Sequence, residues 1–240
     1  MRARMTFLQH SRHDVPGVLG RLAGDAGWHV EVCRADRGAT SLPAPGSFDA
    51  LVVMGSDEST IDPSVGWIGP ERGLVAEAVA SEVPVLGVCF GGQLLAQALG
   101  GEVTRAVRPE IGWRAVDTTD PVRIPPGPWL VWHEDAFRAP PGAEILASTE
   151  VSLHAFVSGI HTGVQFHPEV TREIVEYWVD NAQARGHLDP GQAHELLDGF
   201  GADGCGPEDQ TARLFDGFLE RMGPGSRPVR PGAADTATGA

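Results

Sequence analysis

The sequence predicts an α/β fold with a mostly parallel central sheet, helices on both faces of the sheet, and appended antiparallel β segments. Through residues 1–101, short apolar runs alternate with amphipathic helical segments, which is the pattern of a parallel sheet covered on both faces. Between residues 102 and 166 the pattern changes to short β segments separated by turns, as in antiparallel hairpins. The 240 residues are enough for one full hydrophobic core.

The first half of the chain supplies the expected parallel strands and their helices. We expect strands at 5–9, 28–34, 48–54 and 83–88, and helices at 15–26, at 70–82 and from Gly92 to a Gly100-Gly101 end. Residues 35–47 and 57–70 are expected loops. Ligands of such sheets gather at the carboxyl ends of the strands. Because Gly55 and Cys89 each follow a strand, we expect them to be neighbours.

The second half supplies the expected β appendage and the last helices. We expect β segments at 102–107, 112–118, 129–133, 144–148, 154–157 and 161–166, then helices at 171–185, 194–200 and 208–222. Residues 223–240 are rich in Pro, Gly and Ala and predict a disordered tail. The expected organisation is an α/β domain at 1–186, a C-terminal helical extension packed on the core at 187–222, and the tail at 223–240.

Composition excludes several classes of chemistry and partner. All 18 basic residues are arginine, so a lysine Schiff base and a lysine-dependent phosphate loop are both excluded. A net charge of −14 argues against nucleic acid or an anionic membrane surface as partner. Residues 1–10 are too polar for a signal peptide, and no apolar run reaches membrane length. Three scattered cysteines suit a reducing cytoplasm, so we expect a cytoplasmic protein.

A cysteine stands at the junction between the strand at 83–88 and the helix that follows. Cys89 lies between Gly87 and Gly91, and these glycines permit a tight, strained turn with room for a substrate to approach the backbone. This is the pattern of a nucleophile elbow. A helix N-terminus also favours the thiolate form of a cysteine. A buried structural cysteine in a strand–helix turn is the alternative interpretation.

A histidine and a carboxylate follow the last expected strand. His167 and Glu169 are two residues apart in an extended segment, so their side chains leave the same side of the chain. A carboxylate beside an imidazole orients the ring and stabilises its charged form. His161 is a rival base, but no carboxylate follows it. His133 could be a second base or a metal ligand, but no ligand cluster of matching spacing accompanies it, so we expect no metal.

The cysteine and histidine segments resemble those of class I, triad-type glutamine amidotransferases, especially stand-alone proteins similar to the amidotransferase domain of GMP synthase. The matching motifs are Gly-Val-Cys-Phe-Gly-Gly-Gln at 87–93 and Gln-Phe-His-Pro-Glu at 165–169. Weaker matches are Glu-Ile-Gly-Trp at 110–113 and Trp-His-Glu-Asp-Ala-Phe at 132–137, where Glu134 replaces a glycine. The resemblance covers roughly residues 48–180 and implies a flavodoxin-like sheet.

The resemblance also implies roles for individual residues. It assigns the catalytic triad to Cys89, His167 and Glu169. It assigns the oxyanion hole to the Phe90 amide and to the amide of Gly55 or Ser56. In that second loop, relatives commonly have Gly-Gly-Pro where this chain has Gly-Ser-Asp at 55–57, so the choice between the two amides stays open. The implied substrate-binding residues are Gln93, Gly91 and His133.

The function that follows is hydrolysis of a γ-glutamyl amide, most simply L-glutamine to glutamate and ammonia. No metal or cofactor is implied. Ammonia made in this way normally passes to a synthetase, and we expect that acceptor enzyme to be a separate chain. One alternative is a free-standing hydrolase of γ-glutamyl peptides with the same triad. Another is a non-catalytic binding or regulatory subunit that retains the fold.

Overall fold

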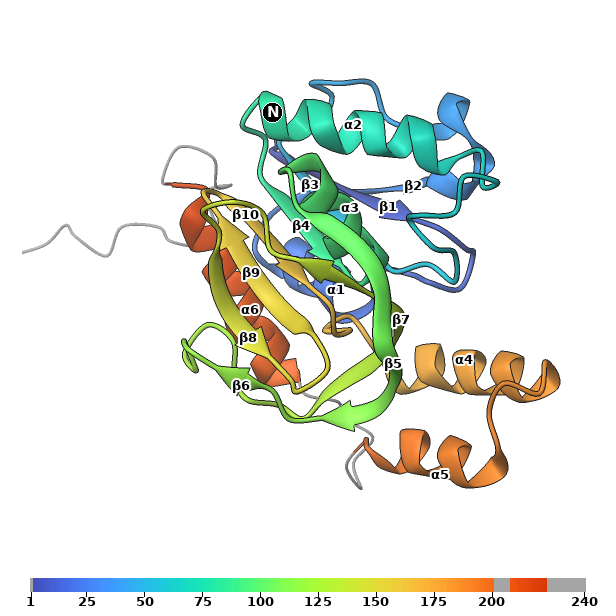
Figure 1. Ribbon diagram of the computed structural model, residues 1–240. Coiled ribbons are helices and arrows are strands. Elements are labelled where there is room, and N and C mark those ends of the chain that lie inside the picture. The colour runs from blue at the N-terminus through green and yellow to red at the C-terminus, as the bar shows by residue number, and fades with distance from the viewer. Residues whose placement is uncertain (1, 201–207, 224–240) are drawn as a thin grey trace, which may run out of the picture.

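The computed structural model of the protein describes residues 2–200 and 208–223 (Figure 1). An eight-stranded sheet has the order β2-β1-β3-β4-β10-β9-β8-β6, and β5 and β7 form a separate two-stranded sheet. Neighbouring strands from β2 to β10 are parallel, whereas β9, β8 and β6 continue the sheet antiparallel. The main-sheet strands are β1 (Arg4–Gln9), β2 (His29–Arg34), β3 (Ala50–Val53), β4 (Val85–Val88), β6 (Asp117–Thr118), β8 (Glu144–Ser148), β9 (Leu153–Ser158) and β10 (His161–Val164). The predicted α/β architecture is confirmed.

Helices cover both faces of the parallel part of the sheet, because alternate strand residues point to opposite sides. Met5 and Phe7 of β1 pack in the cluster that contains residues of α1 (Gly17–Asp25) and α6 (Glu208–Arg221). Leu8 of the same strand packs in the cluster that contains residues of α2 (Ile68–Ala80) and α3 (Phe90–Ala98). The parallel strands are therefore buried on both faces, as their continuous apolar runs predict.

The region between 102 and 166 differs from the expectation in its strand lengths and in one pairing. β5 (Glu102–Arg114) is a single long strand with an irregularity between Arg105 and Glu110, not two segments. It pairs with β7 (Trp129–Arg138) in the long curved ribbon of Figure 1. The segment expected as the last hairpin strand is β10, which pairs antiparallel with β9 but parallel with β4. This pairing brings the residues after β10 beside those after β4.

The last three helices take different places. Thr171 caps α4 (Arg172–Ala184), where its hydroxyl accepts a hydrogen bond from the Ile174 amide. α5 (Pro190–Asp198) starts earlier than expected because Asp189 opens a capping box. α4 and α5 lie side by side, whereas α6 lies against the sheet (Figure 1).

The expected division of the chain into an α/β domain at 1–186, a helical extension at 187–222 and a tail at 223–240 stays a prediction. Apart from its first residue, the expected tail at 223–240 lies outside the described residues.

Within the part of the chain that the structure describes, no helix combines the length and the apolar character needed to span a lipid bilayer.

The packing of α6 predicts that this helix is part of the main core. Phe218 is 1 % exposed and belongs to the cluster on the α1 side of the sheet. Phe218→Ala should therefore lower the free energy of unfolding by about 3–5 kcal/mol, which chemical denaturation measures. Asp216→Ala, at an exposed position on the same helix, should change it by about 0.5 kcal/mol at most. Equal stability of the two variants would show that α6 is peripheral.

Candidate active site

Cys89 lies in a strained turn between β4 and α3. Its backbone has φ 50° and ψ −108°, a positive φ that side-chain-bearing residues rarely adopt. The Cys89 amide donates to the Val164 carbonyl of β10 at 2.8 Å, which ties the turn to the neighbouring strand. A Cβ on Gly91 would collide with the Val53 carbonyl, and one on Gly87 would collide with the backbone of Gly91. The flanking glycines are therefore required by close backbone contacts.

The segment after β10 places an imidazole and a carboxylate together in the interior. His167 and Glu169 are 4 % and 2 % exposed, and Nδ1 of His167 lies 2.9 Å from Oε1 of Glu169. The backbone of the segment is held on two sides. The His167 amide donates to the Leu130 carbonyl at 2.8 Å, and the Glu169 carbonyl accepts from the Val18 amide at 2.9 Å. The imidazole is thus held in one orientation.

The ends of β3, β4 and β10 bring Gly55, Cys89 and His167 together. A Cβ built on Gly55 would lie 3.0 Å from Cε1 of His167 and 3.8 Å from Cβ of Cys89. The predicted proximity of Gly55 and Cys89 is confirmed. His161 begins β10 and so lies at the opposite end of that strand from His167. Because of this separation, His161 cannot exchange a proton directly with Cys89.

The charges around His167 favour its protonated form. Burial alone lowers the pKa of His167, but the nearby Glu169 carboxylate and the Cys89 sulfur outweigh that effect and hold the pKa well above its ordinary value. With Nδ1 bonded to Glu169, Nε2 is the nitrogen left for proton exchange, and it has no hydrogen-bond partner among the described residues. The arrangement can hold a thiolate–imidazolium pair.

Gln165 and the Trp132 carbonyl lie next to the sulfur, and Gln93 contacts Gln165. Nε2 of Gln165 lies 3.5 Å from Cys89 Sγ, and Sγ lies 3.8 Å from the Trp132 carbonyl oxygen. Gln93 donates from Nε2 to the Asp135 carbonyl at 3.1 Å and lies 3.4 Å from Oε1 of Gln165. The sequence motifs predicted no separate role for Gln165. Its place in the expected strand at 161–166, two residues before His167, was the available signal, because alternate residues of a strand share one side.

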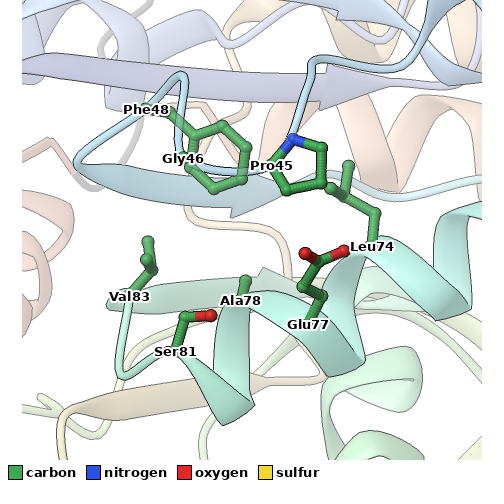
Figure 2. Close-up of a pocket in the computed structure, with 8 residues that line it drawn as sticks. All are labelled: Pro45, Gly46, Phe48, Leu74, Glu77, Ala78, Ser81 and Val83. Atoms are coloured by element: carbon green, nitrogen blue, oxygen red, sulfur yellow. The ribbon is translucent and has the colours of Figure 1, made fainter.

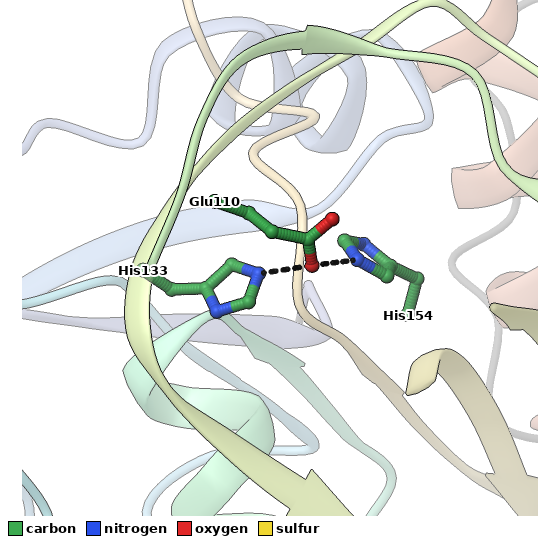
Figure 3. Close-up of side chains that lie close together, drawn as sticks. All are labelled: Glu110, His133 and His154. Atoms are coloured by element: carbon green, nitrogen blue, oxygen red, sulfur yellow. Dashed lines mark hydrogen bonds and ion pairs between the residues drawn. The ribbon is translucent and has the colours of Figure 1, made fainter. Parts of the chain in front are cut away.

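A buried cluster lies beside this site and includes His133. Glu110, His133 and His154 come from β5, β7 and β9, and Figure 3 shows the carboxylate between the two imidazoles. Oε2 of Glu110 lies 3.2 Å from Nε2 of His133 and 3.0 Å from Nε2 of His154. Although burial raises the pKa of Glu110, hydrogen bonds from His133 and His154 outweigh this and hold the pKa far below its usual range.

The cluster has the ligand types of a metal site, which sequence spacing could not show because its residues come from three strands. Each residue offers one ligand atom, and these atoms lie within 4.8 Å of one another. However, the hydroxyls of Ser152 and Thr149 also donate to Glu110, at 2.9 Å and 3.0 Å. These two hydroxyls and Nε2 of His154 therefore already occupy acceptor positions of the carboxylate, and we assign no ion to it.

A separate hollow of about 280 Å³ lies between the loop before β3 and helix α2 (Figure 2). Its lining is largely apolar, with Glu77 as the single ionisable residue. None of the residues implied as catalytic or substrate-binding lines it, so it belongs to a different part of the surface.

The geometry predicts how the His167 pKa responds to its neighbour. Glu169→Gln should lower the pKa of His167, because it removes the carboxylate that stabilises the imidazolium. The imidazole should then lose its proton at a lower pH than in the unsubstituted protein, which NMR titration of the ring measures. Glu173→Gln, at an exposed position four residues further on, should leave this pKa unchanged. An unchanged pKa in Glu169→Gln would contradict the pairing.

Comparison with known proteins agrees with the fold and with the family resemblance of the sequence. The sequence matches the family profile "Glutamine amidotransferase class-I" over residues 18–176. The GMP synthase (glutamine-hydrolyzing) of Thermus thermophilus is 37 % identical over 161 residues, which are 62 % of this chain but only 31 % of that enzyme. A separate GMP synthase (glutamine-hydrolyzing) subunit of Sulfolobus acidocaldarius is 38 % identical over 133 residues, which cover 51 % of this chain and 68 % of that protein.

A solved structure extends the similarity to nearly the whole chain. The crystal structure of a glutamine amido transferase from Methylobacillus flagellatus superimposes with a TM-score of 0.81 at 27 % identity, and covers 93 % of this chain and 96 % of that one. The Thermus enzyme is about three times longer than the matched region, so its complete activity is not carried over. Because the family profile spans most of the chain, this protein belongs to the class I glutamine amidotransferase family.

Proposed function

We propose that this protein hydrolyses the side-chain amide of L-glutamine through a thioester on Cys89. The observation that carries the proposal is the convergence of Cys89, His167 and Gly55 at three adjacent strand ends, with Glu169 bonded to the imidazole. A nucleophile, a base and an orienting carboxylate in this order have the geometry of a catalytic triad. The Thermus and Sulfolobus relatives are both named as glutamine-hydrolyzing.

In the first half of the reaction, the Cys89 thiolate attacks the side-chain carbonyl carbon of glutamine. A carbon–sulfur bond forms, and the carbonyl electron pair moves to oxygen. When this oxyanion collapses, the carbon–nitrogen bond breaks, and Nε2 of His167 protonates the departing ammonia. The raised pKa of His167 suits this step, because the imidazolium is the form that can donate.

In the second half, water attacks the thioester carbon and gives a proton to the now neutral His167. The second tetrahedral intermediate collapses to glutamate, and the thiolate–imidazolium pair is restored. Glu169 holds the ring through both halves at 2.9 Å from Nδ1. The sum is one glutamine and one water converted to one glutamate and one ammonia, and no cofactor is required.

Backbone amides at two loops are the proposed oxyanion donors. The Phe90 amide opens α3, where helix N-terminal amides have no intrahelical acceptor. The second donor comes from the loop at Gly55 and Ser56, next to Cys89. Each such donor contributes about 3 kcal/mol to stabilisation of the transition state. Gly91, Gln93 and His133 remain the proposed residues of the glutamine pocket, and Gln93 and His133 both contact the Asp135 carbonyl.

We further propose that the ammonia passes to a synthetase on a separate chain. The Sulfolobus relative is named as a GMP synthase subunit, and the Methylobacillus structure matches this chain over 96 % of its length. Amidotransferase chains of this size therefore occur apart from a synthetase domain. This chain's net charge of −14 favours a basic docking face on the acceptor.

The nucleophile assignment predicts a complete loss of activity in Cys89→Ala. Release of ammonia from glutamine should fall to background, and a glutamine-analogue electrophile should label Cys89 in the unsubstituted protein. Cys33→Ala is the matched control, because Cys33 is half-buried in β2 and its pKa is raised, first by burial and then by Glu31. Full activity in Cys89→Ala, or equal labelling of Cys33, would reject the assignment of Cys89 as the nucleophile.

Substrate competition separates glutamine hydrolysis from γ-glutamyl peptide hydrolysis. If the chain is an ammonia donor, its glutaminase activity alone should be weak and should rise when the acceptor enzyme is added. The measurement is steady-state kcat/KM for glutamine beside a set of γ-glutamyl dipeptides. Rapid, partner-independent cleavage of the dipeptides with poor use of glutamine would contradict the ammonia-donor proposal and support the peptide hydrolase.

A further inference from the structure

A buried ion pair lies directly behind the loop that contains Gly55. His10 follows β1, Glu71 lies in α2, and both side chains are fully buried. Nδ1 of His10 lies 2.7 Å from the Gly55 carbonyl oxygen, and Nε2 lies 2.9 Å from Oε1 of Glu71. Both ring nitrogens of one histidine are therefore used, one on the backbone of the candidate site and the other on a carboxylate.

The hydrogen-bond chemistry fixes the direction of the first contact. A carbonyl oxygen only accepts, so Nδ1 of His10 is the donor to Gly55. An ionised Glu71 also accepts, which makes His10 a doubly donating imidazolium. Although burial lowers the pKa of His10, Glu71, the Gly55 carbonyl and Asp14 outweigh it and raise the pKa above its ordinary value. Asp36 faces the same group from the turn after β2, where His10 helps to lower the pKa of the Asp36 carboxyl.

The same ring also contacts Phe90, whose amide is the other proposed oxyanion donor. The centroids of His10 and Phe90 are 4.8 Å apart, and those of His10 and Trp67 are 5.1 Å apart in a stacked arrangement. Trp67 and Phe90 are themselves 5.5 Å apart. Because Phe90 follows Cys89 directly, His10 joins the Gly55 loop to the helix that begins at the nucleophile.

Holding the Gly55 carbonyl also sets the direction of the next amide. The Gly55 carbonyl and the Ser56 N–H belong to one planar trans peptide group, in which they point in opposite directions. With the carbonyl bound to His10, the Ser56 N–H points away from the buried pair. No acceptor within the described ranges takes a hydrogen bond from that N–H. It is therefore free to donate to a bound ligand.

We propose that His10 is a positioning residue that orients the Ser56 amide for the oxyanion, and that Glu71 holds the His10 ring in place. This inference rests on the proposed glutamine hydrolysis and assigns its second oxyanion donor. His10 touches neither Cys89 nor the substrate carbonyl in this account. Its effect is transmitted through one hydrogen bond to Gly55 and one ring contact with Phe90.

The test uses Glu71→Gln as the reference, because replacing His10 alone would leave a buried carboxylate without its partner. In that background, His10→Asn retains a side-chain N–H that can reach Gly55, whereas His10→Phe retains only the ring. Glu77→Gln, on the exposed side of α2, is the control for a change of charge in this helix. Thermal unfolding of all variants shows that they fold.

Loss of the hydrogen bond should lower kcat rather than raise KM. We expect kcat for glutamine in the His10→Phe variant to fall about 10- to 100-fold below the Glu71→Gln reference, less than the loss of a whole oxyanion donor. KM should stay within about threefold, since ground-state binding is unchanged. The His10→Asn variant should recover part of the lost kcat. Alkylation of Cys89 by iodoacetamide forms no oxyanion, so its rate should be unchanged throughout.

Two results would overturn the proposal. One is a kcat for the His10→Phe variant equal to the reference. The other is an equal slowing of alkylation and hydrolysis, which would mean that the whole site is disturbed.

Hydrogen exchange of residues 54–58 keeps the proposal testable if the protein does not hydrolyse glutamine. Amide exchange in this segment should be faster in the His10→Phe variant than in the Glu71→Gln reference. In the His10→Asn variant it should be slower than in the His10→Phe variant. Absence of glutaminase activity in the unsubstituted protein would reject the proposed function alone. Unchanged exchange would reject the positioning role of His10, whatever the activity.

Discussion

The backbone of Cys89 is the constraint on which the rest of the site depends. A positive φ of 50° at a residue with a side chain costs about 1–3 kcal/mol and persists only where the surroundings enforce it. Here a backbone hydrogen bond and the close packing of the flanking glycines hold Cys89 in this conformation. The Cys89 amide is bonded to Val164 of β10, and the chain on either side packs so closely that Gly87 and Gly91 cannot carry a side chain. The strained turn presents the thiol at the end of β4.

The parallel pairing of β10 with β4 converts this turn into a site. It sets the segment after β10 beside the turn, so that His167 lies near Cys89 and Glu169 bonds to the imidazole. The antiparallel strands and the β5–β7 ribbon then close the surroundings, and the Leu130 carbonyl of β7 fixes the His167 backbone. Each group is held by a strand end rather than by a flexible loop, which is the arrangement that preorganised catalysis requires.

The sequence predicted the parts of the site that are encoded locally. The glycine–cysteine turn and the His167–Glu169 pair are short motifs, and the strand-end rule correctly predicted that Gly55 lies beside Cys89. The parallel pairing of β10 was not predictable, because an alternating strand looks the same in either direction. His10 and Glu71, which are 61 residues apart, were missed because nothing local marks two buried charges that meet only in the fold. The same holds for the partners of His133, namely Glu110 and His154.

The proposed reaction passes through a covalent thioester on Cys89, which hydroxylamine can trap during turnover. A thioester reacts with hydroxylamine to give γ-glutamyl hydroxamate in place of glutamate. We expect hydroxamate to form at the expense of glutamate, and an acid-quenched sample to contain a γ-glutamyl group on the peptide with Cys89. Continued release of ammonia and glutamate with no hydroxamate, and with Cys89 unmodified in the quenched protein, would contradict the proposed thioester.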